Sequence, residues 1–385
     1  MKIQISVFGR FHSFEMAYQF FKNNYLERIY TTYPYFALKK IVPIEKKFVK
    51  NHLFFELIWR FLKKIKIIYL KNKINLFLKI INDFFVSLHL KKGCDFFIGW
   101  SSHCLISLER SQKLGTLTIL ERGSSHILEQ KEILKEEYEK HNIPFLFSND
   151  HIKRELREYE IADYISVPSE FVKESFIKRG FKEERILLNP YGVNLEKFRR
   201  VARKDDIFRF VFVGNFSIRK GSHYLLQALY ELNLRDTEFW QIGNIPEEIR
   251  PYIDIYRMPN MKFLGIKPQD QLYLYLSQTN VFVLPSLEEG LALVIPQAMA
   301  CGLPVVCTFN SGGSTIVEDK KQGLISKTKD VSNLKDKLLF MYKNKKLASQ
   351  MGLNALKKVK KGFTWDDYGK RYIENLENIK LNKSI

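Results

Sequence analysis

The sequence predicts an α/β protein of two successive units, each a doubly wound parallel sheet, that face each other across a cleft. Two strand-like runs that end in glycine begin the units, residues 2–8 before Gly9 and 208–213 before Gly214. A strand, a helix and a second strand follow one another in residues 279–307. Because ligands bind at the carboxyl ends of parallel strands, two such units place a binding site between them.

Length and composition fit two globular domains. The chain has 385 residues, and no run of 18 or more uncharged apolar residues predicts a transmembrane helix. Residues 1–11 are typical of a buried first strand and not of a signal peptide. The four cysteines lack metal-ligand spacing, which favours reduced core thiols in a cytosolic protein. The net charge of +20 favours a polyanionic partner: a membrane surface, a nucleic acid or a phosphorylated substrate.

After the first strand, aromatic residues at helical spacing predict a helix over 13–21. Residues 39–92 then carry 14 Lys or Arg against 3 Asp or Glu, interleaved with large apolar residues. Within them, residues 54–69 have the pattern of an amphipathic helix with basic flanks, which binds anionic bilayers. An ordinary helix with a solvated lysine face is the alternative. Nucleic-acid binding is a third possibility, although no recognised binding module is visible.

Three short strands are predicted next, at 95–99, 116–120 and 164–167. The second leads into a polar loop that contains Arg122 and His126. A loop histidine with no visible partner is otherwise a solvated surface residue. Between 198 and 208 the composition becomes charged and loses its apolar period, which predicts a linker that ends the first unit.

The second unit restarts with the strand at 208–213 and a polar turn that holds Arg219 and Lys220. The turn precedes a helix predicted at 224–232, so two cations and free N–H groups suit a diphosphate there. A solvated Arg-Lys loop is the alternative.

The rest of this unit follows the same alternation of strands and helices. Further strands are predicted at 239–243 and 262–265, and a helix at 269–278. Beyond residue 334 the chain is helical and basic, and Thr364 is expected to cap a last helix at 366–379.

The chain is organised around residues 286–319. A strand at 279–284, an apolar helix at 291–300 ended by Gly302, and a strand at 303–307 form a βαβ crossover. The crossover brings an acidic loop and a Ser-Gly-Gly loop to the same edge of the sheet.

Polar groups at this edge indicate the ligand chemistry. Glu289 and Gln297 offer hydrogen bonds to the hydroxyls of a sugar or ribose. The helix start beyond Gly290, together with Gly312 and Gly313, lets backbone N–H groups approach a diphosphate. The alternative is that a glutamate here only caps the helix.

This stretch resembles the donor-site signature of glycosyltransferase family 4, retaining GT-B enzymes with the approximate pattern E-G-x-x-L-x-x-x-E-A-M-A-x-G-x-P-V-V and a following Gly-Gly turn. The matching residues are Glu289, Gly290, Leu293, Ala298, Met299, Ala300, Gly302, Pro304, Val305, Val306, Gly312 and Gly313. Gln297 stands where the family has a second glutamate that contacts the ribose hydroxyls. An amide still donates and accepts hydrogen bonds.

The resemblance implies roles for particular residues. Glu289 is expected to hold sugar hydroxyls, and Lys220, beside Arg219, to contact the donor diphosphate. A family histidine that contacts the transferred sugar is matched by His126, although a simple register puts Arg122 there. The catalytic residues expected are therefore Glu289, His126 and Lys220. The remaining donor-site and substrate-site residues expected are Gly9, Arg122, Gly214, Asn215 (where the family often has arginine), Arg219, Gly290, Leu291, Gln297, Gly312 and Gly313.

The resemblance also implies a GT-B fold with an acceptor-side domain at 1–200, a donor-binding domain at 205–363 and a helix at 364–385 that crosses back. The implied activity moves a sugar from a nucleotide diphosphate sugar to a glycan or lipid-linked acceptor, with retention and with neither metal nor other cofactor. We expect a hexosyltransferase-type enzyme of cell-surface polysaccharide or glycolipid synthesis. Its further partner would be an anionic membrane surface, at the inner face of the cell membrane, and not nucleic acid.

Two other readings compete with this one. A non-catalytic GT-B protein that binds membrane or other polyanions is favoured by Gln297 and Asn215, which depart from the family pattern. Intact Glu289, Arg219 and Lys220 speak against it. A nucleotide-sugar epimerase or a glycosyl phosphorylase on the same fold is the second alternative.

Overall fold

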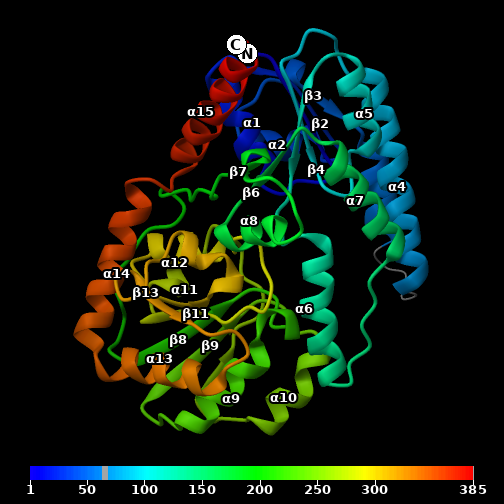
Figure 1. Cartoon of the computed structure of the whole chain (residues 1–385). Coiled ribbons are helices and arrows are strands. Elements are labelled where there is room, and N and C mark those ends of the chain that lie inside the picture. The colour runs from blue at the N-terminus through cyan, green and yellow to red at the C-terminus, as the bar shows by residue number, and fades with distance from the viewer. Residues whose placement is uncertain (63–67, 385) are drawn as a thin grey trace.

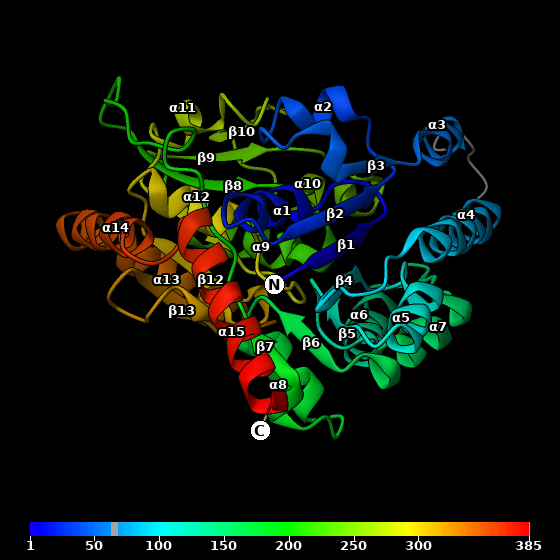
Figure 2. The same ribbon diagram turned by 90° about the horizontal axis from the view of Figure 1, so that it is seen from above.

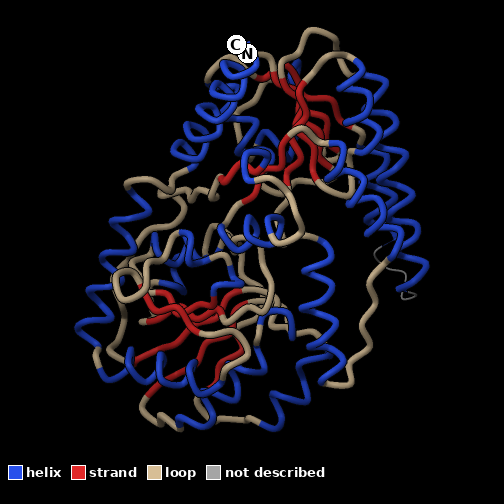
Figure 3. Tube along the Cα trace, in the orientation of Figure 1, coloured by secondary structure: helices blue, strands red, loops and turns tan. Residues whose placement is uncertain are grey.

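The computed structural model describes residues 1–62 and 68–384 and contains two parallel sheets, one in each half of the chain (Figure 1). Each sheet is covered by helices on both faces (Figure 3). Residues at the carboxyl ends of strands in both halves line one common cavity. Parallel strands covered on both faces are apolar along their whole length. Accordingly, β1 and β8 are buried at every residue.

The first sheet has seven strands in the order β3-β2-β1-β4-β5-β6-β7, and every pair is parallel. The strand order reverses between β1 and β4, which is where open sheets of this type form a crevice. The strands are β1 Ile3–Val7, β2 Leu26–Thr31, β3 Val49–Asn51, β4 Phe96–Trp100, β5 Leu117–Glu121, β6 Tyr164–Val167 and β7 Ile186–Leu188.

The helices of this half are α1 Ser13–Lys22, α2 Tyr35–Lys39, α3 Leu53–Leu62, α4 Ile68–His89, α5 Leu105–Lys113, α6 Ile127–Lys140, α7 Asn149–Ile161 and α8 Glu170–Ile177. Short 3₁₀ turns are η1 Lys46–Phe48 and η2 Glu183–Arg185. Seen from above, α3 and the adjoining end of α4 project from the edge of the molecule (Figure 2). None of the described helices combines the length and the apolar character needed to cross a membrane.

The second sheet has six strands in the order β10-β9-β8-β11-β12-β13, again all parallel, and its order reverses between β8 and β11. Its strands are β8 Phe208–Val213, β9 Thr237–Ile242, β10 Met261–Phe263, β11 Val281–Leu284, β12 Val305–Thr308 and β13 Gly323–Ser326. Its helices are α9 Ser222–Leu232, α10 Arg250–Ile255, α11 Leu272–Leu276, α12 Val294–Ala300, α13 Val331–Lys343 and α14 Lys345–Lys360, with 3₁₀ turns η3 Ile218–Lys220, η4 Glu247–Ile249, η5 Phe309–Ser311 and η6 Gly313–Thr315.

The last helix, α15 Trp365–Ser384, packs on α1 of the first half. Thr364 caps it as expected, because its hydroxyl accepts a hydrogen bond from Asp367 N–H at 3.1 Å. Asp366 in the first turn accepts from Gln19 Nε2 at 3.0 Å and pairs with Lys22 at 2.5 Å. The last helix, α15, is thus bound to α1 near the N-terminus (Figure 1).

Three expected helices differ from the structure. The helix expected at 269–278 is limited to α11, Leu272–Leu276. The helix predicted at 291–300 begins only at Val294, because the backbone before it bonds to the neighbouring loop: Glu289 N donates to Asn310 O at 2.9 Å and Ala292 N to Ser311 O at 3.3 Å. The glutamates therefore do not cap this helix. The amphipathic helix expected at 54–69 is divided, since α3 ends at Leu62 and α4 begins at Ile68, and residues 63–67 lie outside the described residues.

Candidate functional site

A cavity of about 470 Å³ lies where the carboxyl ends of the two sheets meet, and we call it the cleft cavity. The first half contributes residues that follow β1, β4 and β5, and the second half contributes residues that follow β8 and β11. The lining residues are Phe11, His12, Trp100, Ser101, Ser102, His103, Arg122, Gly123, Ser124, Glu155, Tyr191, Val213, Gly214, Lys220, Glu289, Leu291, Ala292, Leu293 and Val294.

A second cavity of about 810 Å³ adjoins the first, and the two share Phe11, His12 and Leu293. Residues 192–198, which lead into the predicted linker, and residues 364–366 line it, so we call it the linker cavity. Gln297 of α12 and Gln269 also face this space. The two cavities together can hold a ligand with two chemically different parts.

Lys220 and Glu289 form an ion pair at the wall of the cleft cavity. Lys220 comes from η3, after β8, and Glu289 from the loop after β11, so the two strands nearest the reversal point place them together. Their side chains are 17% and 14% exposed, which leaves both within reach of a ligand. A bound anion can replace Glu289 as the partner of the Lys220 ammonium, and ligand hydroxyls can then donate hydrogen bonds to the Glu289 carboxylate.

Arg219, expected beside Lys220 at the diphosphate, is instead engaged in the protein and lines neither cavity. Its Nη2 lies 2.8 Å from Glu288 Oε2, and its Nε donates to the Glu288 carbonyl at 3.0 Å. Burial would lower the pKa of Arg219, but the carboxylates of Glu288 and Glu289 raise it. Arg219 therefore fixes the acidic loop and does not face the cavity.

Glu288 joins the two halves of the molecule beside the cleft cavity. This fully buried carboxylate accepts from Ser125 N at 3.0 Å, from Ser125 Oγ at 2.8 Å and from Gln130 Nε2 at 2.9 Å, all in the first half. Burial alone would raise the pKa of Glu288, but the Arg219 cation and these hydrogen bonds lower it. We call Glu288 with Arg219, Ser125 and Gln130 the Glu288 bridge.

Gly290 and Gly312 are required by the same close approach of loops. A Cβ on Gly290 would lie 1.9 Å from the carbonyl oxygen of Gly123 in the first half. Gly312 has φ of +73°, and a Cβ there would lie 2.0 Å from the Gly290 carbonyl oxygen. These glycines and Gly313 line neither cavity, and Gly290 and Gly312 let the neighbouring loops approach each other closely.

Arg122 lines the cleft cavity, but its guanidinium is held by the protein. Nη1 pairs with Glu155 Oε2 at 2.7 Å, and Nε donates to Ser125 O at 3.0 Å. Burial would lower the pKa of Arg122, yet Glu155 and neighbouring groups raise it, so the side chain stays charged. Arg122 thus shapes the loop that meets Glu288.

His126 does not reach either cavity, which corrects its expected role at the sugar. Its Nδ1 accepts from Leu128 N at 3.3 Å and so caps α6. Its buried ring lies among Tyr159, Phe176 and Phe181, with centroids 5.0 to 5.8 Å away. α6 begins directly after His126, so the histidine is the helix N-cap and its side chain is buried.

The remaining predicted residues divide between the cavities and their surroundings. Gly214 and Leu291 line the cleft cavity. Gly9 and Asn215 line neither: Gly9 N donates to Thr32 Oγ1 at 2.9 Å, and exposed Asn215 accepts from Asn244 Nδ2 at 3.0 Å.

Sequence reasoning did not assign His12, which faces both cavities. His12 Nε2 lies 3.1 Å from Glu121 Oε2, and Tyr372 of α15 donates to Glu121 Oε1 at 2.7 Å. Its place just after the first strand, at the carboxyl end of the sheet, was the feature of the sequence that could have marked His12 as a site residue. Its pairing with Glu121 arises only when β1 and β5 enter one sheet.

Residues 194–358 match the family described as glycosyl transferases group 1. An uncharacterized glycosyltransferase of Methanocaldococcus jannaschii, MJ1178, is 28% identical over 208 residues, covering 53% of this chain and 56% of that protein. The UDP-Gal:alpha-D-GlcNAc-diphosphoundecaprenol alpha-1,3-galactosyltransferase of Escherichia coli is 26% identical over 209 residues, covering 50% and 54%. This chain spans about half the length of these relatives.

A solved structure of HepE from Anabaena in complex with UDP superposes with a TM-score of 0.68 at 16% identity and covers 98% of this chain and 100% of that one. This likeness shows the fold. The two facing parallel-sheet units are the GT-B arrangement, as the sequence predicted.

The environment of His126 predicts a pH dependence of stability. Burial, with the cations Arg122 and Arg179 nearby, lowers the pKa of His126 from 6.5 to about 4. The unfolded chain therefore binds a proton that the fold does not, and stability falls as pH drops from 6.5 toward 4. Between pH 7 and 4.5 this contributes a loss of about 2 to 3 kcal/mol.

Urea unfolding at pH 7 and pH 4.5 measures this contribution. His126→Asn keeps a capping oxygen for Leu128 N–H and cannot titrate. We expect the variant to lose about 2 to 3 kcal/mol less than the wild type between the two pH values. Equal losses in both proteins would contradict the assignment.

Proposed function

We propose that this chain, which carries a glycosyl transferases group 1 domain at residues 194–358, binds a nucleotide diphosphate sugar between its two sheets and moves the sugar to a glycan or lipid-linked acceptor. The observation that carries the proposal is the Lys220–Glu289 pair, a cation and a hydroxyl acceptor held together at the cleft cavity. A nucleotide diphosphate sugar offers a diphosphate to Lys220 and sugar hydroxyls to Glu289.

The diphosphate is proposed to lie against Lys220. Helix α9 begins two residues later with no side-chain cap, so the positive end of its dipole faces the same place. An ammonium and a helix N-terminus stabilise the charge that develops on a departing diphosphate, and in this proposal no metal is needed.

The sugar is proposed to donate hydroxyl hydrogen bonds to Glu289, and the ribose to use Gln297 in the linker cavity. The shared lining of the two cavities lets one molecule extend through both. Aromatic Trp100 and Tyr191, with His12 and His103, form the wall contributed by the first half. Apolar ring faces with a few polar groups suit a carbohydrate acceptor on that side.

The comparisons support the class of donor and acceptor. HepE was solved with UDP, and the E. coli relative is named for a UDP-sugar donor and a diphosphoundecaprenol-linked acceptor. We infer a UDP-sugar as first choice here and an acceptor of the lipid-linked or polysaccharide type. In the transfer, the bond from the anomeric carbon to the diphosphate breaks, an acceptor hydroxyl forms the new bond, and its proton goes to the leaving phosphate. Family 4 membership and retention stay predictions.

Nucleotide binding is the experiment that tests the proposed function. We expect one nucleotide sugar among UDP, GDP and ADP conjugates to raise the melting temperature, because ligand at 100 times its Kd stabilises by about 2.7 kcal/mol. Lys220→Ala should weaken both the free nucleotide and the sugar conjugate by about tenfold or more, since it removes a charged hydrogen bond. Glu289→Ala should weaken the conjugate much more than the nucleotide.

The control is Lys346→Ala, which removes an exposed cation in α14 of the same half of the chain. It should bind like the wild type. If no nucleotide sugar stabilises the wild type, or if Lys220→Ala binds as well as Lys346→Ala, the proposed donor site is wrong. Binding without transfer to any acceptor would favour the non-catalytic alternative.

We further propose that α3 and α4 place the protein on an anionic membrane surface. Phe54 and Phe61 of α3 are 68% and 72% exposed, and Phe77, Phe84 and Leu88 of α4 are exposed as well. α3 packs on α4, and Phe55 of α3 is buried in one cluster with Leu78 of α4, so a packed pair of helices carries these exposed apolar side chains. Residues 39–92 supply the basic charge that such a surface attracts.

Vesicle flotation checks this surface. The wild type should float with phosphatidylglycerol vesicles at low salt and not with phosphatidylcholine vesicles, since basic charge requires an anionic bilayer. A Phe54→Ser, Phe61→Ser double variant should bind more than about tenfold less, because two aromatic side chains no longer enter the interface.

The matched control is Ile255→Ser with Leu381→Ser, two equally exposed apolar residues on α10 and α15. It should float like the wild type. Absence of wild-type binding to anionic vesicles, or equal loss in both double variants, would refute a membrane surface on α3 and α4.

A further inference from the structure

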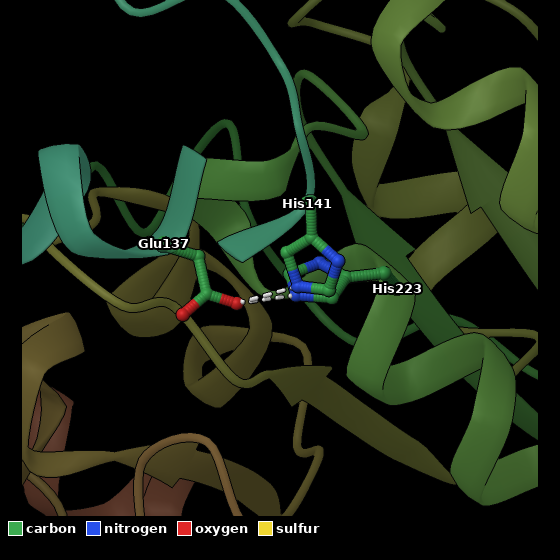
Figure 4. Close-up of side chains that lie close together, drawn as sticks. All are labelled: Glu137, His141 and His223. Carbon is green, nitrogen blue, oxygen red and sulfur yellow. Dashed lines mark hydrogen bonds and ion pairs between the residues drawn. The ribbon is translucent and has the colours of Figure 1, made fainter. Parts of the chain in front are cut away.

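Glu137, His141 and His223 lie close together where α6 and α9 meet (Figure 4). None of the three lines the cleft cavity or the linker cavity. Glu137 lies in the last turn of α6 and His141 caps its end, one helical turn later, so both face the same side. His223 comes from the first turn of α9 in the other half. The two helices meet through these three side chains.

The ligand atoms converge on a small volume. His223 Nε2 lies 2.9 Å and His141 Nε2 3.0 Å from the same oxygen, Glu137 Oε1 (Figure 4). All three ligand atoms lie within 4.8 Å of one another. A tetrahedral Zn²⁺ with ligands at about 2.1 Å separates its ligand atoms by about 3.4 Å, so each imidazole nitrogen needs to move away from Glu137 Oε1 by only about 0.5 Å. One carboxylate and two imidazoles are a donor set that Zn²⁺ and similar transition metals prefer, and that Mg²⁺ and Ca²⁺ do not.

The surroundings orient the histidines. Tyr252 OH lies 2.7 Å from His141 Nδ1, so Nδ1–H can donate to the phenol and leave the Nε2 lone pair for a metal. His223 is 3% exposed, and its Nδ1 has no hydrogen-bond partner among the described residues. Tyr224 OH donates to Glu137 Oε1 at 2.7 Å and so helps to hold this carboxylate beside the imidazoles.

Two lysines, Lys329 and Lys140, lie near this cluster, and both already have partners in the protein. Lys329 Nζ is 3.3 Å from Glu137 Oε2 and 2.9 Å from Glu136 Oε1, so its charge is shared between two carboxylates. Lys140 Nζ donates to Tyr224 OH at 3.2 Å. Within the part of the chain that the structure describes, Glu137 Oε2 makes no hydrogen bond, and Oε1 is the oxygen that faces the imidazoles.

We propose that Glu137, His141 and His223 bind a divalent transition metal of the Zn²⁺ class and that this ion ties α6 of the first half to α9 of the second. The site is structural, and it is separate from the proposed donor site. Its position has a consequence for that site, because His223 follows Lys220 by three residues. A bound ion holds the two halves together and fixes the turn that carries Lys220.

Metal titration of the full chain tests the proposal without any nucleotide, so its outcome is independent of the donor experiment. After removal of metal with EDTA, the wild type should bind one equivalent of Zn²⁺ by calorimetry and melt at a higher temperature when loaded. Co²⁺ should give the visible spectrum of a four-coordinate site with nitrogen ligands, and Mg²⁺ should not compete.

Three variants locate the ion. His141→Gln and His223→Gln keep a hydrogen-bond donor toward Glu137 and should each weaken Zn²⁺ binding by more than tenfold, since loss of a partner behind a ligand already costs about 10- to 100-fold. Tyr252→Phe should weaken it by about that factor and leave the metal-free melting temperature nearly unchanged. His89→Gln, an exposed histidine on α4, is the control and should bind normally.

Two results would overturn the proposal. One is a wild type that takes up no Zn²⁺ at micromolar concentration. The other is Zn²⁺ binding that survives in both His141→Gln and His223→Gln, which would place the ion on other histidines and leave this cluster as a hydrogen-bonded contact.

Discussion

One buried carboxylate, Glu288, joins the two halves of the chain directly beside the cleft cavity. Glu288 comes from the loop after β11, yet its partners Ser125 and Gln130 lie in the opposite half of the chain. A buried charge is stable only when its hydrogen bonds and a counterion are in place, and Arg219 supplies the counterion. The loops that carry Lys220 and Glu289 are therefore positioned only when the halves are together. The contact between the halves therefore also sets the positions of Lys220 and Glu289.

The same constraint explains why neighbouring residues have little freedom. Gly290 and Gly312 allow the loops around Glu288 to touch, and Arg122 holds the opposing loop through Ser125 O. The sequence pattern singled out these residues as site residues. In the structure they position the loops around the cleft cavity. The side chains left to meet a ligand, chiefly Lys220 and Glu289, are those whose partners a ligand can replace.

Much of the fold could be predicted from the sequence because strands buried on both faces are apolar throughout and end in glycine or a polar turn. The 208–213 strand and its following turn were recognisable for this reason, and so was the place of Lys220 and of Glu289 after strand ends. Their ion pair was not predicted, because it depends on which strands become neighbours in the sheet. Helix starts were less predictable, since the backbone at 289–292 bonds to a loop distant in sequence. The His12–Glu121 contact and the burial of His126 depend on tertiary packing, which no local pattern encodes.

The most direct measurement of the central claim is a crystal structure with the UDP-sugar bound. We expect the diphosphate at the Lys220 ammonium beside the start of α9, the sugar hydroxyls at Glu289, and the ribose near Gln297. Electron density for the nucleotide outside the cleft and linker cavities, with Lys220 still paired to Glu289, would contradict it.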